Sequence, residues 1–179
     1  MSLLFNVSQL LKSDVGQLRR YDFQADGMLD LGDSKASDVH GHARFMLTNF
    51  GLIADIHAEA LVHSTCARCL EPFSEPTTVD FEEEYRPVVD ISTGMPADVP
   101  AGDETFEIST NHTIDLGEAI RQQLLLALEL VPVCKNACRG LCPACGVNLN
   151  LEQCTCPPSE DSNPFKVLQG LLADSEFNR

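Results

Sequence analysis

The sequence has few basic residues for its length. Its 179 residues include 12 Lys and Arg against 27 Asp and Glu, which gives a formal net charge of -15. Because this excess of negative charge repels a polyanion over most of the surface, it disfavours broad electrostatic binding of RNA. The same field attracts a positively charged partner, such as a basic ribosomal protein, although acidic charge often serves solubility alone.

The sequence also lacks a long apolar segment. Its longest strongly apolar run, Leu124 to Leu128, stops at Glu129 and falls far short of the roughly 20 residues that cross a bilayer. The segment from Met1 to Asn6 has no basic leader, so no secretory signal is predicted. We therefore expect a soluble, cytoplasmic protein without a membrane partner.

Motifs for catalysis are missing as well. The sequence contains no phosphate-binding loop, no metalloprotease helix motif and no serine elbow. The acidic run Glu82 to Glu84 is no carboxylate pair, because alternation along a strand points Glu83 away from its two neighbours. We expect that the protein is not an enzyme and has no small-molecule substrate.

Cysteine is abundant by contrast. Six of the eight cysteines lie between Cys134 and Cys156. In a reducing compartment such clusters indicate metal ligands rather than structural disulfides. The strongest motif is Cys142-Pro-Ala-Cys145-Gly146, in which two thiolates on a tight turn can share one metal and the glycine lets the backbone curl around the sulfurs. This motif predicts a zinc knuckle.

A second pair of cysteines, Cys66 and Cys69, has the same spacing and follows a predicted strand. Tetrahedral zinc takes four ligands, so eight cysteines can hold one or two zinc ions. The preferred partition has two groups, namely Cys66, Cys69, Cys134 and Cys138, and Cys142, Cys145, Cys154 and Cys156. Because Cys154-Thr155-Cys156 is a tight spacing for one ion, a single zinc bound by the 66/69 and 142/145 pairs remains an alternative.

An iron–sulfur cluster is a competing interpretation of this segment. Cys138, Cys142 and Cys145 have the gaps that three cluster ligands show in radical enzymes. Those enzymes are built from many strands and crossover helices, whereas this chain is short and carries further cysteines beside the trio. Zinc is therefore the favoured metal.

Three basic residues, Arg68, Lys135 and Arg139, lie inside the cysteine segments. Their charge offsets that of thiolate-coordinated zinc, and their N–H groups are placed to donate hydrogen bonds to sulfur. They also form a small basic spot where the acidic protein can present cations to RNA phosphate or to a partner.

Alternating hydrophobicity predicts an antiparallel sheet. Leu52 to Val62 has the period of a half-buried strand, Gly41 to Leu47 is its hairpin partner, and Val79 to Tyr85 is a third strand. Short connections favour antiparallel pairing, because parallel strands need a long crossover. Val88 to Asp103 is predicted to be an exposed loop.

Two helices are predicted after this loop. The first begins at Asp115, where Glu118 completes a capping box, carries a stripe from Leu116 to Val131 and ends at Pro132. The second is a short C-terminal helix that begins at Asn163 and Pro164. The predicted fold class is α+β, an antiparallel sheet or partial barrel packed by one main helix (residues 1–133), with a cysteine-rich zinc module and the C-terminal helix (residues 134–179).

The motifs, taken in order, resemble the YceD family of bacterial and plastid proteins. The resemblance lies in the string from Cys66 to Phe73, the helix from Asp115, the string from Cys138 to Asn150, and the closing Asn163-Pro164-Phe165. It implies a non-enzymatic factor that supports accumulation of large-subunit ribosomal RNA and ribosome biogenesis. The partner would be a ribosome assembly component or a basic ribosomal protein, with contact to the RNA direct or indirect. The alternative function is a thiol-based redox or zinc-responsive regulator.

Overall fold

The fold is mostly sheet, with few helices. The computed structural model describes residues 3–91, 93–97 and 105–157. Contacts within the chain divide it into two compact units. One unit comprises Met1–Ala67 and Glu71–Asn136, and the other comprises Arg68–Leu70 and the residues from Ala137 onward.

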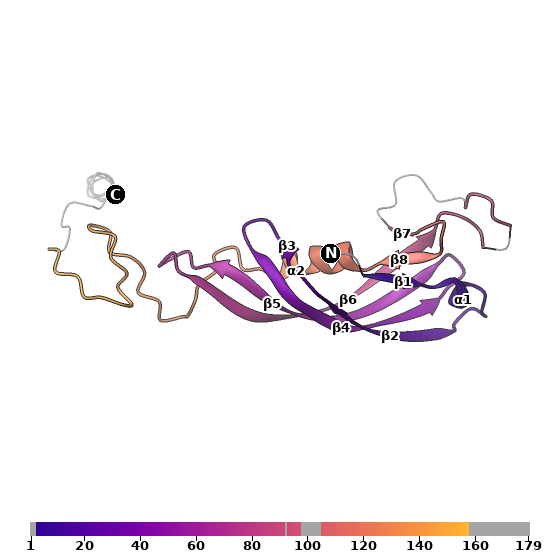
Figure 1. Cartoon of the computed structure of the whole chain (residues 1–179), viewed down its shortest axis with the longest axis horizontal. Coiled ribbons are helices and arrows are strands. Elements are labelled where there is room, and N and C mark those ends of the chain that lie inside the picture. The colour runs from indigo at the N-terminus through magenta and orange to yellow at the C-terminus, as the bar shows by residue number, and fades with distance from the viewer. Residues whose placement is uncertain (1–2, 92, 98–104, 158–179) are drawn as a thin grey trace, which may run out of the picture. The chain divides into compact units, whose positions relative to one another are not determined.

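An open sheet makes up most of the first unit (Figure 1). Its strands lie in the order β2 (Leu18–Ala25), β4 (Lys35–Leu47), β5 (Leu52–Thr65), β6 (Pro72–Pro87) and β7 (Phe106–Ile108), and β3 (Leu29–Asp30) also pairs with β4. A separate two-stranded sheet joins β1 (Leu4–Asn6) to β8 (Thr113–Asp115). The helices are α1 (Ser8–Leu11) and α2 (Gly117–Ala127).

Strand β5 lies at the centre of the sheet and supplies much of the core. The residues at its even-numbered positions from Leu52 to Val62 are all buried. Its neighbours β4 and β6 both pair with it in antiparallel register, with Ile56 opposite Ala43 and Phe81. The predicted three-stranded antiparallel arrangement is therefore confirmed. Burial of one apolar face of β5 requires a fixed register with both neighbouring strands.

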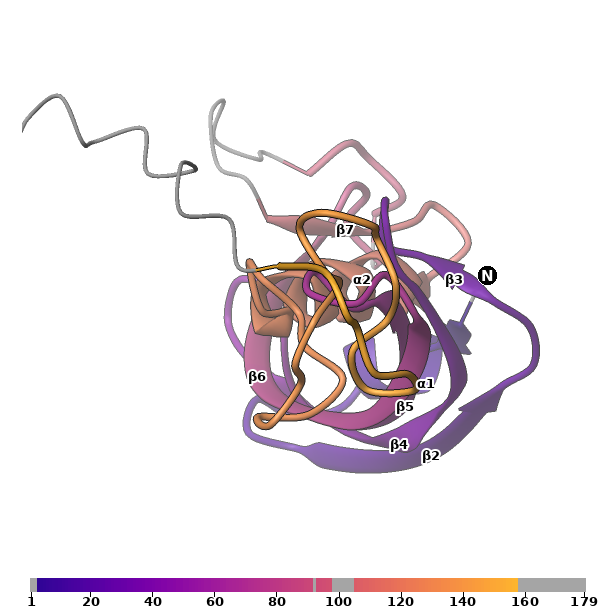
Figure 2. The ribbon, with the colours of Figure 1, turned by 90° about the vertical axis from the view of Figure 1, so that its left-hand side faces the viewer.

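Helix α2 packs on the inner face of the curved sheet, where Ile120 and Leu124 join the same core as the strands (Figure 2). The predicted capping box is wrong. Asp115 lies in β8, and its Oδ1 accepts hydrogen bonds from the backbone N–H groups of Gly117 and Leu3. The carboxylate of Glu118 instead pairs with the side chains of the following turn.

The end of α2 also differs from the prediction. The helix stops at Ala127, because Leu128 has extended backbone angles. The predicted stripe continued to Val131, which is exposed here. The chain instead runs on to Pro132, whose carbonyl accepts a hydrogen bond from the N–H of Ala67 at 2.8 Å. The helix therefore ends before the proline that was expected to end it.

One strand pairing contradicts the expectation of purely antiparallel neighbours. Strand β7 lies parallel to β6, with Tyr85 opposite Phe106. The long connection between the two strands supplies the crossover that parallel pairing needs, and it includes the predicted loop from Val88 to Asp103.

The remaining fold predictions fall partly outside the described residues. The C-terminal helix predicted at Asn163 and Pro164 lies among residues 158–179, which are not described. In the described part of the chain, no helix has both the length and the apolar character needed to span a membrane.

Candidate metal centres

The turn between β5 and β6 positions the first pair of cysteines. Cys66 follows the last residue of β5, and its N–H donates to the carbonyl of Glu71 at 2.9 Å, which closes the turn. Leu70 has a φ of 60°, a left-handed conformation that lets the chain reverse between the cysteines and β6. The side chains of Cys66 and Cys69 are 0% and 3% exposed. Local backbone geometry therefore presents two buried thiols from one turn.

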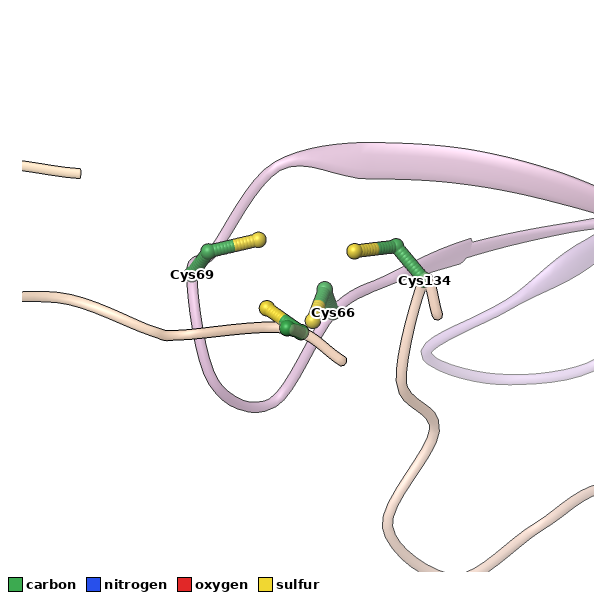
Figure 3. Close-up of side chains that lie close together, drawn as sticks. Cys66, Cys69 and Cys134 are labelled. Atoms are coloured by element: carbon green, nitrogen blue, oxygen red, sulfur yellow. The ribbon is translucent and has the colours of Figure 1, made fainter. Parts of the chain in front are cut away.

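Four thiols gather in the first group. The Sγ atoms of Cys66, Cys69, Cys134 and Cys138 all lie within 4.8 Å of one another. Figure 3 shows the thiols of the first three turned toward one another, with Cys134 contributed by a different segment from the turn. Cys134 is half-buried and the other three are buried. This group is a candidate metal centre of low solvent access.

The second group is built around the knuckle at Cys142. The N–H of Gly146 donates to the carbonyl of Cys142 at 2.8 Å, and Gly146 has a φ of 75°, which favours glycine. The Sγ atom of Cys154 lies 3.3 Å from that of Cys142 and 3.6 Å from that of Cys145. Cys156 completes the group, in which all four sulfurs lie within 4.8 Å.

The sulfur positions of both groups fit tetrahedral zinc. A Zn–S bond of about 2.3 Å places the sulfurs of a tetrahedral site roughly 3.8 Å apart. Within the described residues the eight cysteines form no disulfide, and their two groups are those of the preferred partition. The single-zinc alternative joined the 66/69 and 142/145 pairs, which belong to different groups here. Two groups of four thiols could thus hold metal ions, and metal ligation by these residues stays a prediction.

The ionisation of the second group is uneven. The backbone N–H groups of Cys145 and Ala144, followed by the thiol of Cys154, lower the pKa of Cys142 to about 6. Hydrogen bonds with the thiols of Cys154 and Cys145 raise the pKa of Cys156 to about 12. Because metal binding requires thiolates, a metal bound by this group would displace thiol protons and would be held less tightly as the pH falls.

An asparagine that sequence reasoning missed supports the first group. The Nδ2 of Asn150 lies 3.3 Å from the Sγ of Cys138, and its Oδ1 accepts the N–H of Arg139 at 2.9 Å. A donor to a coordinating sulfur lowers the charge on the thiolate and orients it. The signal available in the sequence was the position of Asn150 at the end of the string that begins at Cys138.

The three predicted basic residues lie close to the thiols in the sequence, and their contacts differ. The Nη1 of Arg68 donates to the carbonyl of Cys138 at 3.3 Å, while the carbonyl of Arg68 accepts the N–H of Leu141 at 3.1 Å. Arg139 and Lys135 are exposed. Arg68 thus holds backbone around the cysteines, and a role of the three in contacting RNA or a partner stays a prediction.

The chain is similar to known proteins, both to a family and to individual relatives. The family model described as "Large ribosomal RNA subunit accumulation protein YceD" matches residues 54–172. The "Large ribosomal RNA subunit accumulation protein YCED homolog 1, chloroplastic" of Arabidopsis thaliana is 34% identical over 58 residues, 32% of this chain and 18% of that protein. The protein of the same name from Zea mays is 37% identical over 62 residues, 34% of this chain and 21% of that protein.

A bacterial relative is matched over a longer segment. An uncharacterised protein of Mycobacterium tuberculosis is 37% identical over 87 residues, 49% of this chain and 40% of that protein. The matched segments therefore cover well under two thirds of these relatives. No solved structure matches the chain. Since the family model extends from within β5 to beyond both groups of thiols, the chain belongs to the YceD family.

Proposed function

We propose that the protein is a non-enzymatic factor that supports the accumulation of large-subunit ribosomal RNA during ribosome assembly. The observation that carries this proposal is the match to the YceD family model over residues 54–172. That span includes β6, α2 and both groups of thiols. The strands and helix from β6 onward and both candidate metal centres thus lie in the part shared with the family, whereas β2, β3 and β4 precede it.

The chemistry of the thiol groups supports a structural role for the metal. A catalytic zinc site keeps one position open for water or substrate, whereas a site with four cysteine ligands is closed. Each group offers four thiols, which is a full set of ligands. When bound, zinc would contribute folding free energy and hold the surrounding loops in place. The resulting rigid surface suits recognition rather than turnover.

The charge of the protein favours a basic protein as the direct partner. The formal net charge is -15. On the outer face of the sheet, Asp55 and Glu59 of β5 and Glu82 of β6 are exposed. Such a field speeds encounter with a positively charged ribosomal protein and opposes contact with bare RNA.

A gene deletion tests the proposed function. We expect the ratio of mature large-subunit RNA to small-subunit RNA to fall in the deletion strain and to recover with the wild-type gene. A gene carrying Cys66→Ser should restore the ratio incompletely, whereas the exposed substitution Lys12→Met should restore it fully. An unchanged ratio in the deletion strain would contradict the proposal.

Affinity purification with and without ribonuclease tests the partner. A basic ribosomal protein that survives ribonuclease treatment supports contact through protein. Recovery of large-subunit precursors alone, and only before treatment, would place RNA as the direct partner instead.

A second candidate is a thiol-based redox or zinc-responsive regulator. The exposure of Cys145 favours it, since an accessible thiol is open to oxidants and to competing chelators. Alkylation of the zinc-loaded protein followed by mass spectrometry tests this function. It requires Cys145 to react while metal is bound, and complete protection would exclude it.

A further inference from the structure

The end of α2 and the segment after it expose large apolar side chains to solvent. Leu126, Leu130 and Val131 are 79%, 102% and 63% exposed. A single exposed leucine is ordinary on a soluble protein, whereas several apolar side chains exposed close together mark a surface for a partner. Neither the core nor the candidate metal centres account for these three side chains.

A hollow of about 330 Å³ lies against the same segment, large enough to take apolar side chains of a partner. Its lining passes from the core to the surface, because Leu31 is buried, Leu128 is half-buried and Leu130 is exposed. The full lining is Leu31, Asp33, Ser34, Thr65, Ala67, Leu128, Glu129, Leu130 and Pro132. The hollow therefore continues the exposed apolar surface inward.

Hydrogen bonds fix the walls of this hollow without a partner. The N–H of Leu31 donates to the carbonyl of Ser34 at 3.0 Å, and the Oγ of Ser34 lies 2.8 Å from that of Ser64. The N–H of Ala67 donates to the carbonyl of Pro132 at 2.8 Å, which holds the segment after α2 beside the end of β5. A partner that docks here consequently loses little affinity to ordering of this surface.

Two carboxylates in the lining set the charge of the partner. Asp33 and Glu129 are both exposed, and neither carboxylate has a hydrogen bond or an ion pair within the described part of the chain. Lys35 shares a neighbouring hollow with Asp33 but does not line this one. An apolar surface that carries two unpaired negative charges complements an apolar segment with positive flanks.

Charge also separates this partner from the other possible occupants. A second copy of the chain carries the same formal net charge of -15 and is repelled. Residues 158–179 of the chain itself are acidic as well, with Glu160, Asp161, Asp174 and Glu176 against Lys166 and Arg179. A basic protein is attracted by the whole field and by the two carboxylates.

We infer that this hollow, together with Leu126, Leu130 and Val131, docks an apolar segment of a basic protein whose flanking residues are lysine or arginine. The inference rests on the proposed function and names the surface through which its basic partner binds.

Binding of a labelled synthetic peptide to the full chain, followed by fluorescence anisotropy, tests the chemistry of the surface. The probe has leucines on one helical face and lysines elsewhere, and a second peptide has glutamate at each lysine position. The lysine peptide should bind at least tenfold more tightly than the glutamate peptide. Equal binding of the two peptides would overturn the inference.

Two pairs of variants locate the binding of the lysine peptide. Leu130→Gln should weaken binding roughly tenfold, because a fully exposed leucine becomes buried in the complex, whereas Leu151→Gln, at another exposed leucine, should have no effect. Glu129→Gln should reduce the salt dependence of binding, and the matched control Glu152→Gln should not. Equal effects within either pair would overturn the inference.

Amide chemical shifts of the wild-type protein provide a measurement that no variant can disturb. They should change at Leu31, Thr65 and Leu130 when the lysine peptide is added. Changes confined to other residues would overturn the assignment of the surface.

A photocrosslinking amino acid at position 130 of the full chain identifies the occupant in growing cells. We expect adducts with a basic protein that persist after ribonuclease treatment and that the same group at position 151 does not form. Adducts only with RNA, with a second copy of the chain or with residues 158–179 would each overturn the inference, as would the absence of any adduct.

Failure of this surface is distinguishable from failure of the proposed function. A reduced ratio of large-subunit to small-subunit RNA in the deletion strain, without an adduct at position 130, would remove the docking surface alone. An unchanged ratio in that strain would remove the proposed function even if position 130 forms an adduct with a basic protein.

Discussion

Replacing a buried cysteine should cost more stability than replacing an exposed one from the other centre. Cys66 is 0% exposed, whereas Cys145 is exposed. Serine at either position removes a metal ligand, but only at Cys66 does it also bury a hydroxyl in a site shaped for sulfur. An unsatisfied buried hydroxyl costs about 1–3 kcal/mol, and an exposed one is hydrated at almost no cost.

Chelator separates the two contributions. When chelator has removed zinc, we expect the Cys145→Ser variant and the wild type to have the same free energy of unfolding in urea. Cys66→Ser should remain less stable by about 1–3 kcal/mol, which corresponds to a fall in Tm of several degrees, on the order of 2–4 °C per kcal/mol for a chain of this length. Circular dichroism follows both transitions. Equal stability of the two variants in chelator would refute the burial argument.

Three other substitutions test the fold. Gly41→Ala should destabilise the sheet by about 1–3 kcal/mol, because the added methyl would overlap the backbone oxygen of His57 on the neighbouring strand; urea unfolding measures this. Asp115→Ala should cost about 1–2 kcal/mol, since two backbone N–H groups lose their acceptor, and Asp115→Asn should recover most of it. The third, Asp80→Asn, should lower the pKa of His57, which NMR titration measures. The hydrogen bond with Asp80, followed by the one with Glu59, holds this pKa above its ordinary value.

The pH dependence of this last pair has a definite sign. The folded pKa of His57 is raised, so its contribution to stability is complete below the unfolded pKa of about 6.5. That contribution is lost as the pH rises through the folded pKa. Asp80→Asn should therefore destabilise the protein more at acidic than at alkaline pH, and a uniform effect across that range would contradict the assignment.

The centre of the sheet could be predicted from sequence because its pattern is strictly local. Alternation from Leu52 to Val62 identifies β5 and its buried face, and the short turn before it identifies β4. The first half of β4 was missed because the register shifts between Ser37 and His40, where Asp38 has a φ of 52°. A bulge of this kind interrupts the alternation on which the prediction depends.

Contacts between distant segments could not be predicted from local sequence patterns. The pairing of β6 with β7, for example, joins strands that are separated by a long connection. The grouping of the thiols could be proposed because cysteine spacing is specific, but burial, which separates Cys66 from Cys145, depends on the folded environment.

The number of zinc ions per chain tests the central claim most directly. Metal analysis of protein purified under reducing conditions without chelator should find two equivalents of zinc. Cys66→Ser and Cys142→Ser should each lose about one, because the two residues belong to different groups of thiols. A wild-type protein that holds well under one equivalent would contradict the account.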